Sequence, residues 1–155
     1  ALPFVRHHNI KYGGQFPIWV AVELFTFGML GSLFDLMREN DQRAVSREYN
    51  LSPESLSRLI ASAVDVRNIC AHYNRLYNRV LDDQPLLPNR LRLYESDRLF
   101  PLLLAFAHIL GRERVLNRLI TGLSLLEADF PEADLSLCGF PEDWHSILEA
   151  EAAQS

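Results

Sequence analysis

A series of polar residues at helical spacing is the feature of this sequence best suited to chemistry. Its members are Asp65, Asn68, His72, Arg75 and Arg79. Successive members are three, four, three and four residues apart, so on one continuous helix all of them would project from the same side. The spacing therefore predicts a polar helix face that carries a carboxylate, an amide, an imidazole and two guanidinium groups.

Together with Arg67, these residue types suit metal-independent cleavage of RNA. That reaction needs a base for the 2′-hydroxyl proton, an acid for the leaving oxygen and positive charge for the transition state. The His72 imidazole can serve in either proton transfer near neutral pH, and the Arg67 guanidinium matches phosphate oxygens. Asn68, one turn before His72, could orient the imidazole or bind a phosphate oxygen. Arg67 lies about 140° around a regular helix from His72, so a joint role requires a long reach or a distorted helix.

Each of these residues also has a structural alternative. A single histidine beside an apolar stripe is often a hydrogen-bonded structural residue. Arg67 could pair with Glu23 or Asp65 inside the protein, which would either hold the guanidinium ready or remove it from the site. Arg75 and Arg79 either bind the RNA backbone or belong to an exposed helix face without a function.

Other chemistries have weaker support. Potential metal-ligating atoms occur in His7-His8, in Cys70-Ala71-His72 and in His145, but no second pair has the spacing of a closed zinc site. No phosphate-binding loop, nucleophile elbow or dinucleotide fingerprint occurs. We therefore expect no metal and no cofactor.

The first predicted element is a central, mostly buried helix that begins at Pro17 and ends near Asn40, because its residues are apolar on nearly every face. Gly28 and Gly31 lie within it, which indicates close approach of a neighbouring helix. Glu23 is the exception in this apolar segment, and we expect it either to reach the surface or to have a partner. The preceding Gly13-Gly14 is interpreted as a turn.

A long helix is predicted from Ser52-Pro53 to about residue 79, after a short helix over about 41–48. Ser52 supplies an N-cap and Pro53 a first-turn residue. Its core stripe is formed by Leu59, Val66, Ile69, Tyr73, Leu76 and Val80. We accordingly expect Tyr73 and Tyr77 to pack in the core rather than stack on bases.

The remaining chain predicts further helices and a loop. Residues 81–91 are interpreted as a loop, and helices are expected from Ser96 to about Leu110, from Arg112 to about Glu127, and over the short stretch 141–150. The stretch 128–139 resembles a loop, and strand-like alternation is absent from the sequence. The predicted fold class is all-α, a bundle of four to five main helices plus short helices.

Length, charge and cysteine content narrow the class of protein. The 155 residues fit one domain over 1–155, which we expect to be cut from a longer chain. The net charge is −5, yet residues 58–92 hold six arginines against three aspartates, while residues 127–151 hold eight acidic residues and no Lys or Arg. The apolar surroundings of Cys70 and Cys138 predict reduced, core-filling thiols. With no apolar run long enough to span a membrane and no secretory signal, we expect a soluble, cytoplasmic protein without a membrane partner.

Five motifs follow one another along the chain. They are Tyr12-Gly13-Gly14, Phe16-Pro17-Ile18-Trp19, the run Glu23 to Gly28, the core VRNICAHYNRLYNR from Val66 to Arg79, and Gly139 to Trp144. In this order they resemble the Abi-like family of abortive-infection proteins, of the AbiD/AbiF type. The core contains the Arg-Asn-x-x-x-His form of the motif of HEPN domains. The resemblance covers nearly the whole chain and suggests the C-terminal, HEPN-bearing portion of such a protein.

The resemblance implies a fold and an activity. It implies a HEPN-like helical bundle and a metal-independent endoribonuclease of bacterial phage defence, with Arg67, His72 and Asn68 as catalytic residues. In this interpretation Glu23 and Asp65 support the site. Products would carry 2′,3′-cyclic phosphate and 5′-hydroxyl ends. Because HEPN ribonucleases pair two domains around one cleft, it also implies a homodimer with a composite active site.

RNA is the expected partner, and Arg75 and Arg79 are its expected binding residues. An N-terminal region or an antitoxin-like regulator is a further expected partner. One alternative is a catalytically silent HEPN module that binds RNA, a nucleotide or another protein through its arginines. Another is a purely structural dimerisation bundle whose interface is the helix with Gly28 and Gly31.

Overall fold

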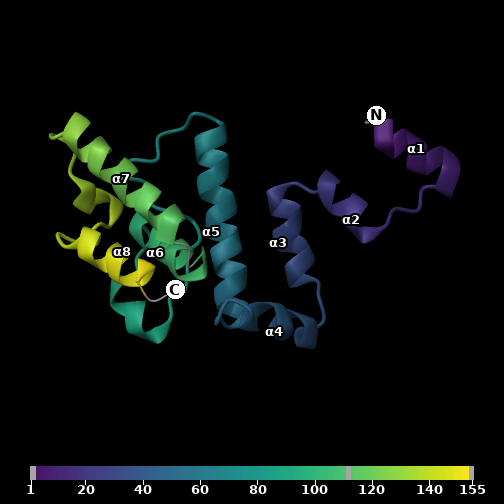
Figure 1. The fold of residues 1–155 in the computed structure, drawn as a ribbon, viewed down its shortest axis with the longest axis horizontal. Coiled ribbons are helices and arrows are strands. Elements are labelled where there is room, and N and C mark those ends of the chain that lie inside the picture. The colour runs from purple at the N-terminus through teal and green to yellow at the C-terminus, as the bar shows by residue number, and fades with distance from the viewer. Residues whose placement is uncertain (1–2, 111–112, 154–155) are drawn as a thin grey trace.

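The computed structural model describes residues 3–110 and 113–153, and these residues form helices and connecting segments only, which confirms the predicted all-α class. The elements are α1 (Pro3–Tyr12), α2 (Ile18–Ala21), η1 (Val22–Leu24), α3 (Phe27–Asp35), α4 (Glu39–Arg47), α5 (Pro53–Ala71), η2 (Asn89–Tyr94), α6 (Leu99–Leu110), α7 (Glu113–Asp129), η3 (Leu135–Cys138) and α8 (Trp144–Ala152), where η marks a 3-10 helix. In Figure 1, α5 stands between α6, α7 and α8 on one side and α3 and α4 on the other.

The hydrophobic core lies between α5 and the C-terminal helices. Phe100, Leu104 and Ala107 of α6 are fully buried, and Leu148 of α8 is buried with them. The same cluster includes Leu59, Ala63 and Ile69 of α5. Helix α6 thus joins α5 to the α7–α8 pair, and the core holds α5 in place from Leu59 to Ile69.

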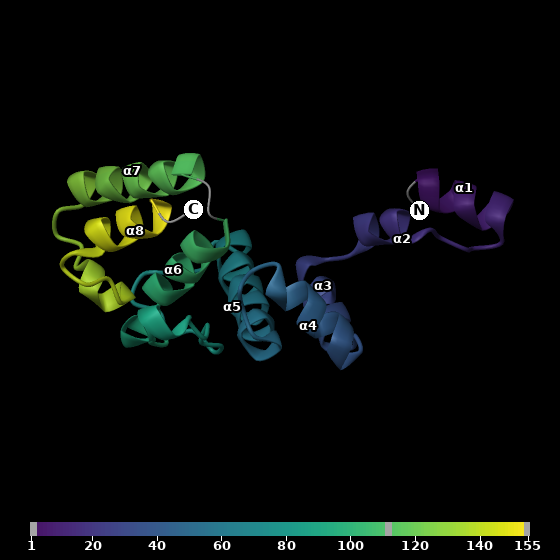
Figure 2. The same ribbon diagram turned by 60° about the horizontal axis from the view of Figure 1, so that its bottom comes forward.

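The predicted long helix over residues 17–40 is wrong, because the structure breaks it. Phe25 is extended (ψ 133°), and Thr26 caps a new helix by accepting a hydrogen bond from the Met29 backbone N–H at 3.2 Å. The apolar character of the segment concealed this capping residue. Nor is the segment mostly buried: α1 and α2 form an arm that extends away from the body (Figure 2), and Trp19 is 71% exposed.

The glycines of α3 bring it close to α5, as predicted. A Cβ atom on Gly31 would lie 3.1 Å from Cγ2 of Ile60, and one on Gly28 would lie 3.7 Å from Cγ1 of Val64. This glycine face is therefore covered by α5 of the same chain, so the two glycines are accounted for by packing within one chain. The helix α1 was not predicted, whereas the turn at Gly13-Gly14 is confirmed, with positive φ at both residues.

Helix α5 begins as predicted and ends eight residues earlier than predicted. Ser52 Oγ accepts a hydrogen bond from the Ser55 backbone N–H at 3.0 Å. At the other end Ala71 is the last helical residue, and Tyr73 has a left-handed backbone (φ 54°). The chain beyond it is held by distant partners, because Tyr77 Oη hydrogen bonds to both backbone groups of Asp134. These tertiary contacts outweigh the local helical pattern.

The remaining boundaries lie close to those expected. Helix α4 lies within two residues of its predicted range, α6 begins three residues after Ser96, and the two last helices are α7 and α8. The stretch 128–139, expected to be a loop, contains the short helix η3. No helix in the described part of the chain has the length and apolar character needed to cross a membrane.

Candidate functional site

The Arg-Asn pair of the motif lies exposed on the last turns of α5. Arg67 Nη1 donates a hydrogen bond to Asn68 Oδ1 at 2.9 Å. Neither Glu23 nor Asp65 lies within ion-pair distance of Arg67 in residues 3–110, so the alternative of a structural ion pair is not formed there. Glu23 instead lies in η1 and is exposed, which is one of the two outcomes expected for it.

His72 marks the end of α5. Its φ and ψ of −95° and 12° leave the helical region, and its backbone N–H donates to the Asn68 carbonyl oxygen at 3.0 Å. The imidazole is on an exposed residue, which argues against the alternative of a packed core histidine. No side-chain hydrogen bond joins His72 to Arg67 or Asn68 in the described chain. Thus Asn68 positions the Arg67 guanidinium and not the imidazole in this single chain.

The two remaining arginines are not on α5. Because the helix ends at Ala71, Arg75 and Arg79 lie in the segment that follows it, and both are exposed. The predicted single polar face is therefore wrong: only Asp65 and Asn68 share the regular helix, and His72 caps it. Sequence spacing assumed a continuous helix and could not show this break.

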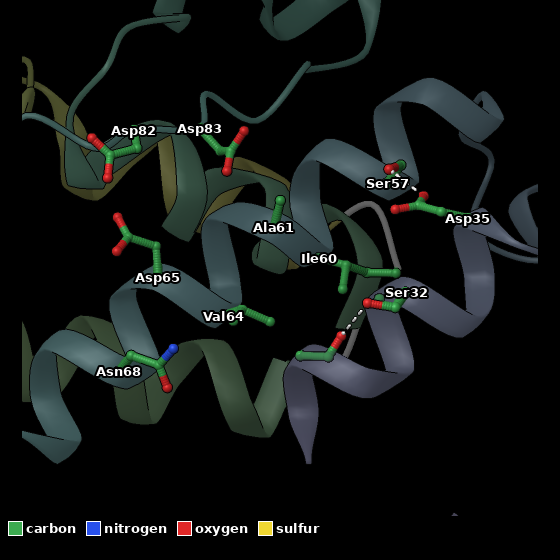
Figure 3. Close-up of a pocket in the computed structure, with 12 residues that line it drawn as sticks. Ser32, Asp35, Ser57, Ile60, Ala61, Val64, Asp65, Asn68, Asp82 and Asp83 are labelled. Carbon is green, nitrogen blue, oxygen red and sulfur yellow. Dashed lines mark hydrogen bonds between the residues drawn. The ribbon is translucent and has the colours of Figure 1, made fainter. Parts of the chain in front are cut away.

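Asp65 lines an acidic pocket beside the motif. This pocket has a volume of about 370 Å³ and lies between α3 and α5 (Figure 3). It is lined by Gly28, Gly31, Ser32, Asp35, Ser57, Ile60, Ala61, Val64, Asp65, Asn68, Asp82 and Asp83. Asp65 Oδ2 is buried without a hydrogen-bond partner. Four aspartates repel phosphate, so the pocket is unsuited to the RNA backbone and limits where RNA can approach Asn68.

The histidines and cysteines considered as metal ligands do not lie together in the described residues. No three His, Cys, Asp or Glu side chains among the residues described are grouped as a metal ion would require. His145 Nε2 instead lies 3.0 Å from Ser124 Oγ, and His8 Nδ1 lies 3.0 Å from the Phe4 carbonyl oxygen. Both cysteines are free thiols; Cys138 is buried as predicted, but Cys70 is exposed, so its predicted place in the core is wrong.

The tyrosines also differ from the prediction. Tyr73, expected in the core stripe, is 98% exposed because the helix ends before it. Tyr77 is 39% exposed, with its hydroxyl bonded to the Asp134 backbone. Sequence reasoning therefore missed an exposed aromatic residue next to His72. No local signal reveals it, since neither Gly nor Pro marks the end of α5.

Comparison with known proteins identifies one family. Residues 1–78 match the sequence model of the family described as Abi-like protein, which covers half of the chain. The matched region contains α1 to α5 and the motif from Val66 to Asn78, so only its last residue, Arg79, lies outside the match. No curated protein and no solved structure matches the chain.

Proposed function

Since the chain belongs to the Abi-like family, whose proteins act in abortive infection as a defence against phage, we propose that it is a metal-independent endoribonuclease with a HEPN-type site. RNA is its substrate, and the cytoplasm is the compartment that supplies it. The single observation that carries the proposal is the exposure of Arg67, Asn68 and His72 together at the C-terminal end of α5, followed directly by the exposed Arg75 and Arg79.

The reaction follows from the chemistry of these side chains. The neutral His72 imidazole removes the proton of a ribose 2′-hydroxyl, which attacks the adjacent phosphorus. The Arg67 guanidinium, held by Asn68, neutralises charge on the phosphoryl oxygens in the transition state. A protonated imidazole then gives a proton to the leaving 5′-oxygen. A 2′,3′-cyclic phosphate and a 5′-hydroxyl remain.

Two proton transfers favour two copies of His72 in one site. Each chain supplies one motif histidine, and its imidazole makes no side-chain hydrogen bond to Arg67 within the chain. We therefore propose a homodimer in which the two exposed ends of α5 face each other. One His72 then serves as the base and the other as the acid. Neither Glu23 nor Asp65 makes an ion pair with His72 in the described residues, so we assign them no proton transfer.

A binding module without catalysis is the second candidate. It is favoured by one observation: no carboxylate or amide side chain orients the His72 ring in the described residues. A histidine without an orienting partner is a weaker general base, because its tautomer and direction are not fixed. In that case Arg67, Arg75 and Arg79 hold RNA, and a regulator or a further region of the protein supplies the response.

Cleavage of RNA by matched variants tests the proposal. Purified protein is incubated with mixed RNA and excess EDTA, beside Arg67→Ala, His72→Ala and the control Arg43→Ala. Arg43 is an exposed arginine that pairs with Glu39 on α4, which contacts the opposite end of α5. We expect a loss of at least about a hundredfold in rate for the first two variants and none for the control.

The variants also separate the two candidates. Circular dichroism should be unchanged, since both side chains are exposed. RNA binding without cleavage by the wild type would favour the binding module. Cleavage that survives in His72→Ala would contradict the proposed site.

A further inference from the structure

Tyr73 is the most exposed large hydrophobic side chain among those described, and it directly follows His72. Its exposed fraction is 98%, against 39% for Tyr77 four residues later. The side chain makes no hydrogen bond or ring contact with any residue that the structure describes. Because the Tyr73 ring removes almost no apolar surface from water, it adds little to the stability of the fold. Folding therefore does not explain why a tyrosine occupies this position.

The backbone of Tyr73 adds a second observation. Its φ of 54° is in the left-handed region, where a bulky side chain is unfavourable and glycine is the usual residue. The Asn74 N–H donates to the Ile69 carbonyl oxygen at 3.0 Å and the Tyr73 N–H donates to that of Cys70 at 3.1 Å, which ends the helix in this conformation. Thus an aromatic side chain occupies a helix-ending position that glycine would fill with less strain. Such strain is characteristic of functional sites.

The surroundings of Tyr73 define what it can bind. Arg75 and Arg79 follow it on the same exposed segment, and His72 is its neighbour at about 3.8 Å between Cα atoms. An aromatic ring among exposed guanidinium groups is the combination that binds single-stranded nucleic acid, in which the ring stacks on a base and the cations contact the backbone.

We propose that Tyr73 is the base-stacking residue of the RNA site and binds an unpaired base beside the phosphate that faces His72. This inference rests on the proposed function and adds to it a substrate class, single-stranded RNA. A base inside a duplex presents no free face, so stacking on Tyr73 requires an unpaired nucleotide. Stacking tolerates any base, and the site accordingly selects strandedness and not sequence.

Tyr77, unlike Tyr73, is held in place by hydrogen bonds. Its hydroxyl accepts a hydrogen bond from the Asp134 N–H at 3.0 Å and donates one to the Asp134 carbonyl oxygen at 3.2 Å. This side chain therefore anchors the segment after α5 to the region before η3. Tyr73 extends from the anchored segment with nothing to hold its ring, which leaves both ring faces open to a base.

Binding to an RNA that cannot be cleaved tests the proposal. The probe is a fluorescent single-stranded RNA of about 12 nucleotides with 2′-O-methyl riboses, which lack the attacking hydroxyl. Its affinity is measured by fluorescence anisotropy in EDTA for the wild type, Tyr73→Asn, Tyr73→Phe and the control Tyr49→Asn. Asparagine tolerates the left-handed backbone but has no ring. Tyr49 is a 41% exposed tyrosine after α4, near the other end of α5.

We expect Tyr73→Asn to weaken binding about tenfold, and Tyr73→Phe and Tyr49→Asn to stay within about twofold of the wild type. The difference should vanish with a probe annealed to its complement. The melting temperature of Tyr73→Asn should equal or exceed that of the wild type, which excludes unfolding as the cause.

Failure of the inference and failure of the proposed function give different results. Equal affinity of Tyr73→Asn and wild type for the single strand, with cleavage of unmodified RNA retained by the wild type, would overturn the stacking role alone. Ring-dependent binding without cleavage by the wild type would support the stacking role and overturn the proposed ribonuclease. No binding of the single strand by the wild type would overturn both.

Discussion

His108 is a largely buried histidine whose environment favours its neutral form. Its Nδ1 lies 3.2 Å from Nη2 of Arg90, which in turn bonds to both carboxylate oxygens of the buried Glu151. Burial lowers the pKa of His108 from its ordinary value of 6.5, and the positive charge of Arg90 lowers it further, while Glu151 opposes these effects more weakly. A proton on Nδ1 would also remove the acceptor that faces Arg90.

Acidic pH should destabilise the folded protein through His108. Because the pKa of His108 is lower in the folded state, the unfolded chain binds more protons below about pH 6.5. The contribution of His108 to stability is therefore complete above that pH and decreases as the pH falls below it. We expect the urea midpoint of the wild type to fall more between pH 7.5 and pH 5.5 than that of His108→Gln. An equal or smaller fall in the wild type would contradict this account.

The sequence was sufficient to select the residues of the candidate site. It was not sufficient to predict their hydrogen-bond partners or the exposure of their neighbours. Arg67, Asn68 and His72 were recognisable because the chemistry needs those functional groups, and the structure places them all on exposed residues. The partner of Arg67 was not recognisable, since its pairing with Asn68 depends on a side-chain conformation. The exposure of Cys70 and Tyr73 was missed for another reason, namely the early end of α5.

The two ends of helix α5 are determined in different ways, the start by local residues and the end by residues distant in the sequence. Its start could be predicted because Ser52 and Pro53 act within their own turn. Its end depends on residues about 60 positions away: Asn78 N–H donates to Cys138 Sγ at 3.4 Å, and Tyr77 contacts Asp134. Apolar spacing within the helix carries no information on such contacts. The same limitation applies to the break at Phe25-Thr26.

Gly139, the residue that follows η3, has no room for a side chain. Its φ is 83°, and a Cβ atom there would lie 2.7 Å from Cβ of Arg98. We expect Gly139→Ala to destabilise the protein by about 2 kcal/mol, from the left-handed backbone and the steric conflict together. The measurement is a shift of the urea midpoint.

Gly122→Ala is the matched control for Gly139→Ala. Gly122 lies within α7, and an added Cβ atom would contact nothing within 4 Å. Because alanine favours a helix more than glycine does, this variant should be stabilised by up to about 1 kcal/mol. Equal midpoints for the two variants would show that the fit at Gly139 is looser than the structure indicates.

In the whole molecule, the arm of α1 and α2 exposes several large apolar side chains to solvent. Ile10, Ile18 and Trp19 are 76%, 62% and 71% exposed. Large apolar side chains exposed on one segment are typical of a protein interface. Helix α1 also carries Arg6 and Lys11 and no acidic residue, while the pocket between α3 and α5 contains four aspartates. This charge complementarity is compatible with the proposed homodimer, in which the arm would contact a second copy of the chain.

The dimer is tested by its mass in solution. We expect the wild type to have twice the 17.8 kDa mass of one chain, and Trp19→Glu to shift toward the monomer because it places a charge in the apolar interface. Light scattering after size exclusion measures both. The helical content should not change, since Trp19 is exposed in the single chain. A wild type that remains monomeric at all concentrations would contradict the composite site.

We propose that Arg67 and His72 cleave RNA through the ribose 2′-hydroxyl without a metal. The most direct measurement is the chemical identity of the product ends after incubation of the wild type with RNA in excess EDTA. We expect 2′,3′-cyclic phosphate and 5′-hydroxyl ends, and we expect both to be absent when His72 is replaced by Ala. Products with 5′-phosphate and 3′-hydroxyl ends, or RNA left intact by an RNA-bound dimer, would contradict it.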